Sequence, residues 1–202
     1  MTLIDRTAYP KFKQLPDPKE LAELYTPTET EIKFVKSRTK SQSGFLCFIV
    51  MLKSFQQLGD FSHPECVPIA VIKHLRSYLK LQDWVKAILS ERQRYNYENA
   101  IRKYLGVKQY DKPAQKLIVI AIATSAEVKD HPADLINVAI EELVKERYEL
   151  PAFSIDRLVG HIRASVNDFP GAKHPDIEHP QLGLFAYYLT YLILKFDSIL
   201  HI

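Results

Sequence analysis

The chain has 202 residues, of which 47% are hydrophobic and 25% are charged, proportions that exclude disorder over most of its length. Residues 1–110 carry 18 Lys and Arg against 11 Asp and Glu, whereas residues 111–202 carry 9 against 13, so a polyanionic partner would favour the first part. From the two cysteines and the charged, proline-containing start we expect reduced thiols in preference to a disulfide, no signal peptide and a cytoplasmic protein.

The first half predicts a series of helices. After a short helix in "DPKELAELYT", the motif "TPTE" predicts a helix over about 27–39, with Thr26 as N-cap and Glu29 closing a capping box. The run 44–59, "GFLCFIVMLKSFQQLG", is apolar on nearly every side but shorter than the roughly 20 residues that cross a bilayer. It therefore predicts a central buried helix, and a further amphipathic helix is expected over 68–81.

The segment "WVKAILSERQRYNYENAIRKYLG" predicts a helix-turn-helix unit. One helix would end near Ser90, Arg92 and Arg94 would lie in the turn, and a second helix would run over about 95–105. A helix fits the major groove of B-DNA, and the preceding helix braces it against the backbone. The outward face of the second helix is expected to carry Asn99, Arg102 and Lys103.

A second such unit is predicted after residue 110. The run "LIVIAIA" could form a strand on residue type alone, but helix is preferred because its neighbours are helical. An amphipathic, acidic helix over 133–147 leads through "YELPAF" into a second helix that starts at Ser154. This hairpin is first of all a connection between core helices, and the side chains that it would offer to DNA are Arg157, His161 and Arg163.

These elements predict an all-α fold, a multi-helix bundle with two helix-turn-helix-like units. We expect an arm over 1–17, a first helical DNA-binding subdomain over 18–110, a second over 111–167, and an atypical apolar tail over 168–202. The tail, with "QLGLFAYYLTYLILKF", is slightly short for a membrane span, which favours a helix packed on the domain, or an adventitious segment, over a membrane anchor.

No catalytic motif is present: the sequence lacks a phosphate-binding GxxxxGK, a GxGxxG, a GxSxG, an HExxH and a CxxC. His174 and His179, with Asp176 and Glu178, lack the helical spacing of a metal site. We therefore expect no enzyme activity, no cofactor and no metal.

Four segments in unbroken order resemble the N-terminal region of Tn-three family transposases, the large bacterial enzymes of replicative transposons. The resemblance covers residues 10–167, and its most specific pieces are "ADLINVAIEELVKERYELPAF" and the helix with "GF" and "LKSFQQLG". The four segments are "LYTPTETEIKFVKSRTKSQSGFLCFIVMLKSFQQLGDF", "VPIAVIKHLRSYL", "RYNYENAIRKYLGVKQY" and "HPADLINVAIEELVKERYELPAFSIDRLVGHIRASVN".

The resemblance implies an all-helical region that binds the terminal inverted repeats of a transposon. Catalysis in that family belongs to an acidic-triad, metal-dependent core far downstream, so none of its carboxylates corresponds to a residue here. The sequence departs from the family at Ser43, where a basic residue often precedes the glycine, and over 168–202. These departures lead us to expect a truncated transposase, located at the bacterial nucleoid when bound to DNA.

The sequence thus predicts a non-catalytic module that binds double-stranded DNA at a transposon inverted repeat. The alternative is an interaction or regulatory fragment that associates with itself or with full-length transposase. The side chains expected to contact DNA are Lys36, Arg38, Lys40, Arg92, Arg94, Asn99, Arg102, Lys103, Ser154, Arg157, His161 and Arg163.

Overall fold

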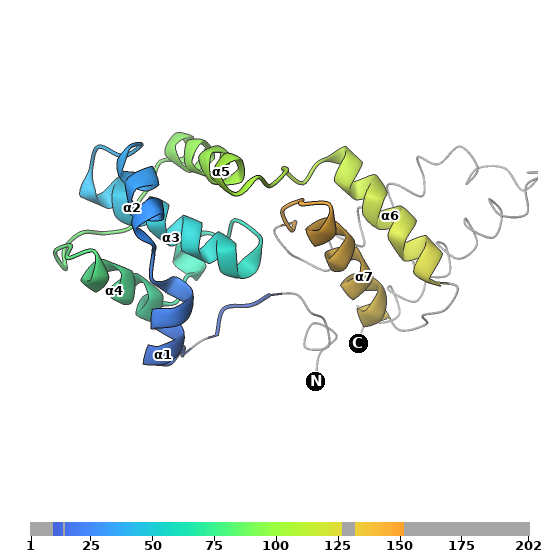
Figure 1. Ribbon diagram of the computed structural model, residues 1–202, viewed down its shortest axis with the longest axis horizontal. Helices are drawn as coiled ribbons and strands as arrows, with labels where there is room; N and C mark the ends of the chain where they lie inside the picture. The colour runs from blue at the N-terminus through green and yellow to red at the C-terminus, as the bar shows by residue number, and fades with distance from the viewer. Residues whose placement is uncertain (1–9, 14, 127–131, 152–202) are drawn as a thin grey trace, which may run out of the picture. The chain divides into compact units, whose positions relative to one another are not determined.

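The computed structural model describes residues 10–13, 15–126 and 132–151 (Figure 1). They fall into two compact units, one over Pro10–Val107 and one that begins at Lys108. Within these residues the regular structure is helical and no β-strand is formed, which confirms the predicted all-α fold.

The first unit is built around one buried helix, α3, with α2, α4 and α5 packed on it (Figure 1). Its helices are α1 (Pro18–Glu20), which continues as a π-helical turn (Leu21–Tyr25), α2 (Glu29–Lys36), α3 (Gln42–Leu58), a 3-10 turn (Pro64–Cys66), α4 (Ile69–Tyr78) and α5 (Glu91–Leu105).

Helix α3 forms the core because its apolar side chains point in every direction. Leu46, Phe48, Ile49 and Leu52 are fully buried, and burial of each such side chain stabilises the fold by about 1.5–3 kcal/mol. The helix ends at Gly59, whose φ of 70° is a left-handed conformation that glycine adopts without strain. The prediction of a central buried helix over this run is confirmed.

The start of α2 differs from the prediction. Thr28, not Thr26, is the N-cap, and Glu31 completes the capping box by accepting a 2.7 Å hydrogen bond from the Thr28 backbone. The sequence "TPTETE" contains two overlapping boxes, and contacts with α3 select the second. Glu31 also accepts a 2.7 Å hydrogen bond from Gln56 and lies 3.6 Å from the ammonium of Lys53.

The second unit is an antiparallel pair of helices, α6 (Lys112–Ala126) and α7 (Pro132–Lys145), which lie side by side (Figure 1). Helix α6 contains the "LIVIAIA" run, so the preference for helix over strand is confirmed. Buried apolar side chains form the contact between the two helices: Ala114, Ile118, Val119, Ile122, Leu135, Ile136, Ala139 and Leu143.

The turn after α7 folds back on the start of the unit. Arg147 adopts a φ of 58° and ends the helix, with the Tyr148 N–H bonded to the Leu143 carbonyl at 2.8 Å. The Lys108 N–H then donates to the Arg147 carbonyl at 2.7 Å, and the Glu149 N–H donates to the Lys108 carbonyl at 2.9 Å. The stretch "YELP" therefore has a structural role, while the helix predicted from Ser154 and the apolar tail lie outside the described residues.

Candidate nucleic-acid interface

Helix α5 does not belong to the predicted helix-turn-helix unit. Residues 79–90 contain no helix, so the expected helix ending near Ser90 is absent. Ser90 instead caps the start of α5, where its hydroxyl accepts from the Gln93 N–H and the Gln93 side chain bonds back to the cap. Arg92 and Arg94 consequently lie in the first turn of α5 and not in an interhelical turn.

Three of the predicted DNA contacts on α5 are held in an internal network around Glu98. The Glu98 carboxylate lies 2.9 Å from Nε of Arg94 and 3.6 Å from Nη2 of Arg102. Arg102 also donates to the Asn99 Oδ1 at 2.9 Å and stacks over the Phe61 ring at 4.8 Å. Arg94 further donates to the Phe61 carbonyl at 3.2 Å.

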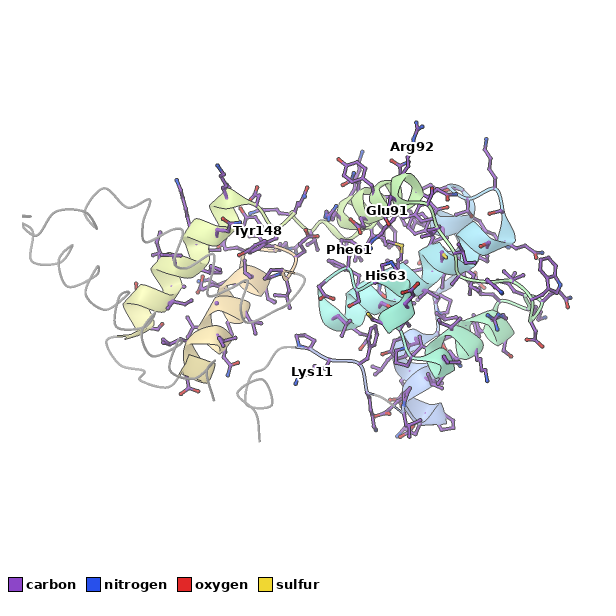
Figure 2. The ribbon with its side chains drawn as sticks, turned by 180° about the vertical axis from the view of Figure 1, so that it is seen from behind. Lys11, Phe61, His63, Glu91, Arg92 and Tyr148 are labelled. Carbon is purple, nitrogen blue, oxygen red and sulfur yellow. The ribbon has the colours of Figure 1, made fainter. Side chains whose placement is uncertain are left out.

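This network corrects the expected placement of Arg94 in an interhelical turn and of Asn99 and Arg102 on a free outward face, while their contact with DNA stays a prediction. The Arg102 and Glu98 side chains are only 12% and 16% exposed, so the two arginines join α5 to the segment after α3. The remaining cations of α5, Arg92 and Lys103, are exposed, and Figure 2 shows Arg92 directed away from the helix.

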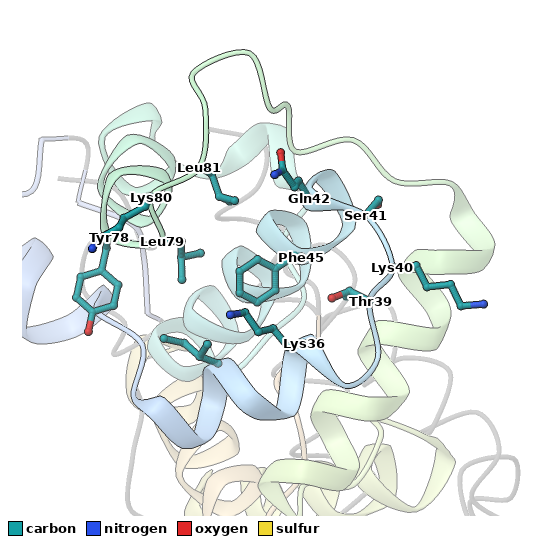
Figure 3. A pocket seen from close by; sticks show the side chains of 11 residues that line it. Lys36, Thr39, Lys40, Ser41, Gln42, Phe45, Tyr78, Leu79, Lys80 and Leu81 are labelled. Atoms are coloured by element: carbon teal, nitrogen blue, oxygen red, sulfur yellow. The ribbon is translucent and has the colours of Figure 1, made fainter.

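A cationic cleft opens beside the start of α3 in the first unit (Figure 3). Its volume is about 460 Å³, and it collects side chains from α2, from the start of α3 and from the end of α4. Lys36 lies across the Phe45 ring, with Nζ 5.8 Å from its centroid, while Lys40 and Lys80 lie on opposite sides of the opening. The lining residues are Ile32, Lys36, Thr39, Lys40, Ser41, Gln42, Phe45, Tyr78, Leu79, Lys80 and Leu81.

The electrostatics of the cationic cleft favour an anion. None of its lining residues is acidic and three of them are lysines, so the lining carries a net positive charge. The 17-residue helix α3 also begins here, with Ser41 as its N-cap. The first N–H groups of a helix lack intrahelical partners and carry partial positive charge, which adds to the attraction.

The backbone of Lys80 is unusual for a lysine. Lys80 has a φ of 54° and follows α4 in a Schellman motif, with its N–H bonded to the Ser77 carbonyl and the Leu81 N–H bonded to the Arg76 carbonyl, both at 3.0 Å. Glycine is the usual residue at this position, because a side chain there costs about 1–2 kcal/mol. Despite this strain the position carries a lysine, whose ammonium group adds a positive charge to the cationic cleft that glycine would not supply.

The other predicted contacts divide into two groups. Arg38 does not line the cationic cleft: its guanidinium lies 4.4 Å from the Phe34 ring centroid and donates to the Ser37 hydroxyl at 3.0 Å. The contacts predicted in the second unit lie outside the described residues: Ser154, Arg157, His161 and Arg163.

Sequence reasoning missed the contribution of Lys80 and Tyr78. Both lie about 40 residues from Lys36 and Lys40 in the chain, so no local pattern joins them. The available signal was "YLKLQ", in which a lysine follows the last turn of a helix where glycine is usual.

The described residues offer neither a metal site nor a membrane span. They contain no cluster of three His, Cys, Asp or Glu side chains that could hold a metal ion. None of the helices described has both the length and the apolar character needed to cross a membrane.

Fold and site together define an all-helical protein with a cationic cleft. The chain belongs to the family described as Domain of unknown function (DUF4158), whose model matches residues 1–162. No curated protein and no solved structure matches the chain.

Proposed function

We propose that the chain is a non-catalytic module that binds double-stranded DNA through the cationic cleft. The observation that carries this proposal is that Lys36, Lys40 and Lys80 all line one cleft beside the start of α3, in a lining without carboxylates. A row of phosphates neutralises such a cluster and releases condensed counterions, which is the main source of affinity in protein–DNA binding.

The rest of the surface supplies secondary contacts. Arg92 and Lys103 on α5 are exposed in the same unit and extend the set of available cations. The resemblance to the end-binding region of Tn-three family transposases supports the same conclusion and adds a target, the terminal inverted repeat of a transposon. In this proposal strand transfer belongs to a transposase core, and this chain contributes recognition.

Binding to a fluorescein-labelled random-sequence duplex, followed by anisotropy at several salt concentrations, tests the proposal. We expect Lys36→Ala/Lys40→Ala/Lys80→Ala to weaken binding and to reduce the slope of log affinity against log salt by about two to three, since each phosphate contact contributes about 0.9. The matched control is Lys19→Ala/Lys33→Ala/Lys73→Ala, which removes the same charge from exposed positions of the same unit outside the cleft.

Equal affinity and equal salt slope for the two triple variants would overturn the role of the cationic cleft. Specific recognition is a separate question, answered by selecting duplexes from a randomised pool with the unaltered protein. We expect one motif to be enriched, and retention of the pool without enrichment would leave phosphate binding in place while refuting recognition of a defined end.

A further inference from the structure

Trp84 is exposed at a place where the surrounding chain is anchored. Its exposed fraction is 74%, whereas its neighbour Val85 is 2% exposed and belongs to the core. Before it, Lys80 and Leu81 line the cationic cleft. After it, the Lys86 carbonyl accepts a 2.6 Å hydrogen bond from Ser43 in the first turn of α3. Trp84 therefore projects from a loop that is held on both sides and whose first residues line the cleft.

The path of this loop is visible in Figure 3, where the chain continues from Leu81 past Gln42 at the start of α3. Between residues 79 and 90 the loop carries two lysines, Lys80 and Lys86, and one carboxylate, Asp83. A solvent-exposed indole is a large apolar surface, and its flat ring stacks favourably on other aromatic rings. Where a cationic groove holds the phosphates of a nucleic acid, exposed aromatic side chains stack on its bases.

We propose that Trp84 stacks on a nucleobase of the DNA whose phosphates occupy the cationic cleft. This inference rests on the proposed function and adds to it a contact with bases. Opening a base step of an intact duplex costs a few kcal/mol, whereas stacking one base on an aromatic side chain returns about 1–3 kcal/mol. Trp84 therefore favours DNA in which a base is already unpaired.

Tryptophan emission gives a direct test, because Trp84 is the only tryptophan in the sequence. The protein is titrated with an intact duplex and with the same duplex carrying unpaired bases at its centre. We expect the emission to be quenched, and the unpaired duplex to bind about tenfold more tightly, which corresponds to the lower half of the stacking range.

The same two duplexes are then titrated against variants by anisotropy. Trp84→Ala is expected to remove the preference for the unpaired duplex, and Trp84→Phe is expected to restore part of it. Ile88→Ala is the matched control, because Ile88 is 66% exposed on the same loop and offers no aromatic ring. Thermal melting should be unchanged in all three variants, since neither side chain belongs to the core.

The outcomes separate this inference from the proposed function. Lysine-dependent binding with unchanged emission, or with equal preference in the wild type and Trp84→Ala, overturns base stacking and leaves DNA binding intact. A lack of binding to either duplex removes both. Emission that changes with protein concentration in the absence of DNA shows that a second copy of the chain covers Trp84, and it too overturns the stacking role.

Discussion

The Ser43 hydroxyl donates a 2.6 Å hydrogen bond to the backbone carbonyl of Lys86, 43 residues further along the chain. Ser43 occupies the position where the resembling transposases often carry a basic residue. Here its short side chain fixes the loop that carries Trp84 to the first turn of α3. In this chain the side chain at position 43 thus serves a hydrogen bond within the protein.

Replacing Ser43 with alanine should release this loop. We expect Ser43→Ala to lower the free energy of unfolding by about 1 kcal/mol, the usual net contribution of one hydrogen bond, and to speed amide exchange over residues 82–90. Ser37→Ala is the control, because that hydroxyl bonds to the Phe34 carbonyl within its own helix end. Unchanged exchange over 82–90 would show that core packing by Val85, Ala87 and Leu89 holds the loop without this hydrogen bond.

The network around Glu98 predicts that one group of cations on α5 stabilises the fold and that another group is available for DNA. Arg102→Ala should lower the free energy of unfolding by about 1.5–3 kcal/mol, because it removes hydrogen bonds between charged and partly buried groups. Arg92→Ala and Lys103→Ala should change stability by less than about 0.5 kcal/mol but reduce the salt slope of DNA binding. Thermal melting measures the change in stability, and anisotropy measures the change in salt slope. A larger loss of stability in Arg92→Ala or Lys103→Ala than in Arg102→Ala would contradict the structural role of the network.

Replacing Lys80 with glycine should have opposite effects on stability and on DNA binding. Lys80→Gly should raise the free energy of unfolding by about 0.5–1 kcal/mol, since relief of backbone strain exceeds the added entropy of the unfolded chain. The same change should weaken DNA binding, because it removes a charge from the cationic cleft. Arg147→Gly is the matched control: its φ of 58° predicts similar stabilisation, with the loss of a charge elsewhere. Equal affinity for both variants would refute a binding role for Lys80.

The buried Glu31 predicts a loss of stability in acid. Burial raises the pKa of Glu31, but hydrogen bonds from Thr28 and Gln56 and the charge of Lys53 outweigh it and hold the pKa below the ordinary 4.5. Its contribution is therefore present above pH 4.5 and is lost as the pH falls through the lower pKa of the folded state.

The test of this pH dependence is Glu31→Gln. It should destabilise the protein at neutral pH by about 3 kcal/mol, because Lys53 stays buried without its partner, and should flatten the acid limb of a stability–pH curve. Glu29→Gln, a change in the same first turn at an exposed carboxylate, is the control and should keep the slope of the wild type.

Much of the fold follows from sequence patterns that act locally. The all-round apolar run of α3 and its final Gly59 predict a buried helix, and the alanines of α6 favour helix over strand; the structure confirms both. The predicted start of α2 at Thr26 is wrong, because the local sequence offers two overlapping capping boxes. The distant Gln56 and Lys53 decide between them.

The candidate site was less predictable, for two different reasons. The spacing of Arg94, Glu98 and Arg102 at successive intervals of four already indicates ion pairs along one face of a helix, so this network was readable from the sequence. The missed capping box "SERQ" likewise marks the true start of α5. The cationic cleft, in contrast, joins Lys36 with Lys80 through tertiary packing, which no local pattern encodes.

The pairing of Lys108 with Arg147 and Glu149 has a consequence for how the chain can be engineered. Because the α6–α7 hairpin begins and ends at the same place, its entry and exit points coincide. An element with adjacent ends can be excised, replaced by a short linker or grafted into a host protein without stretching the flanking chain. The hairpin can therefore be transferred as one piece, and the two backbone hydrogen bonds of Lys108 mark where it begins and ends.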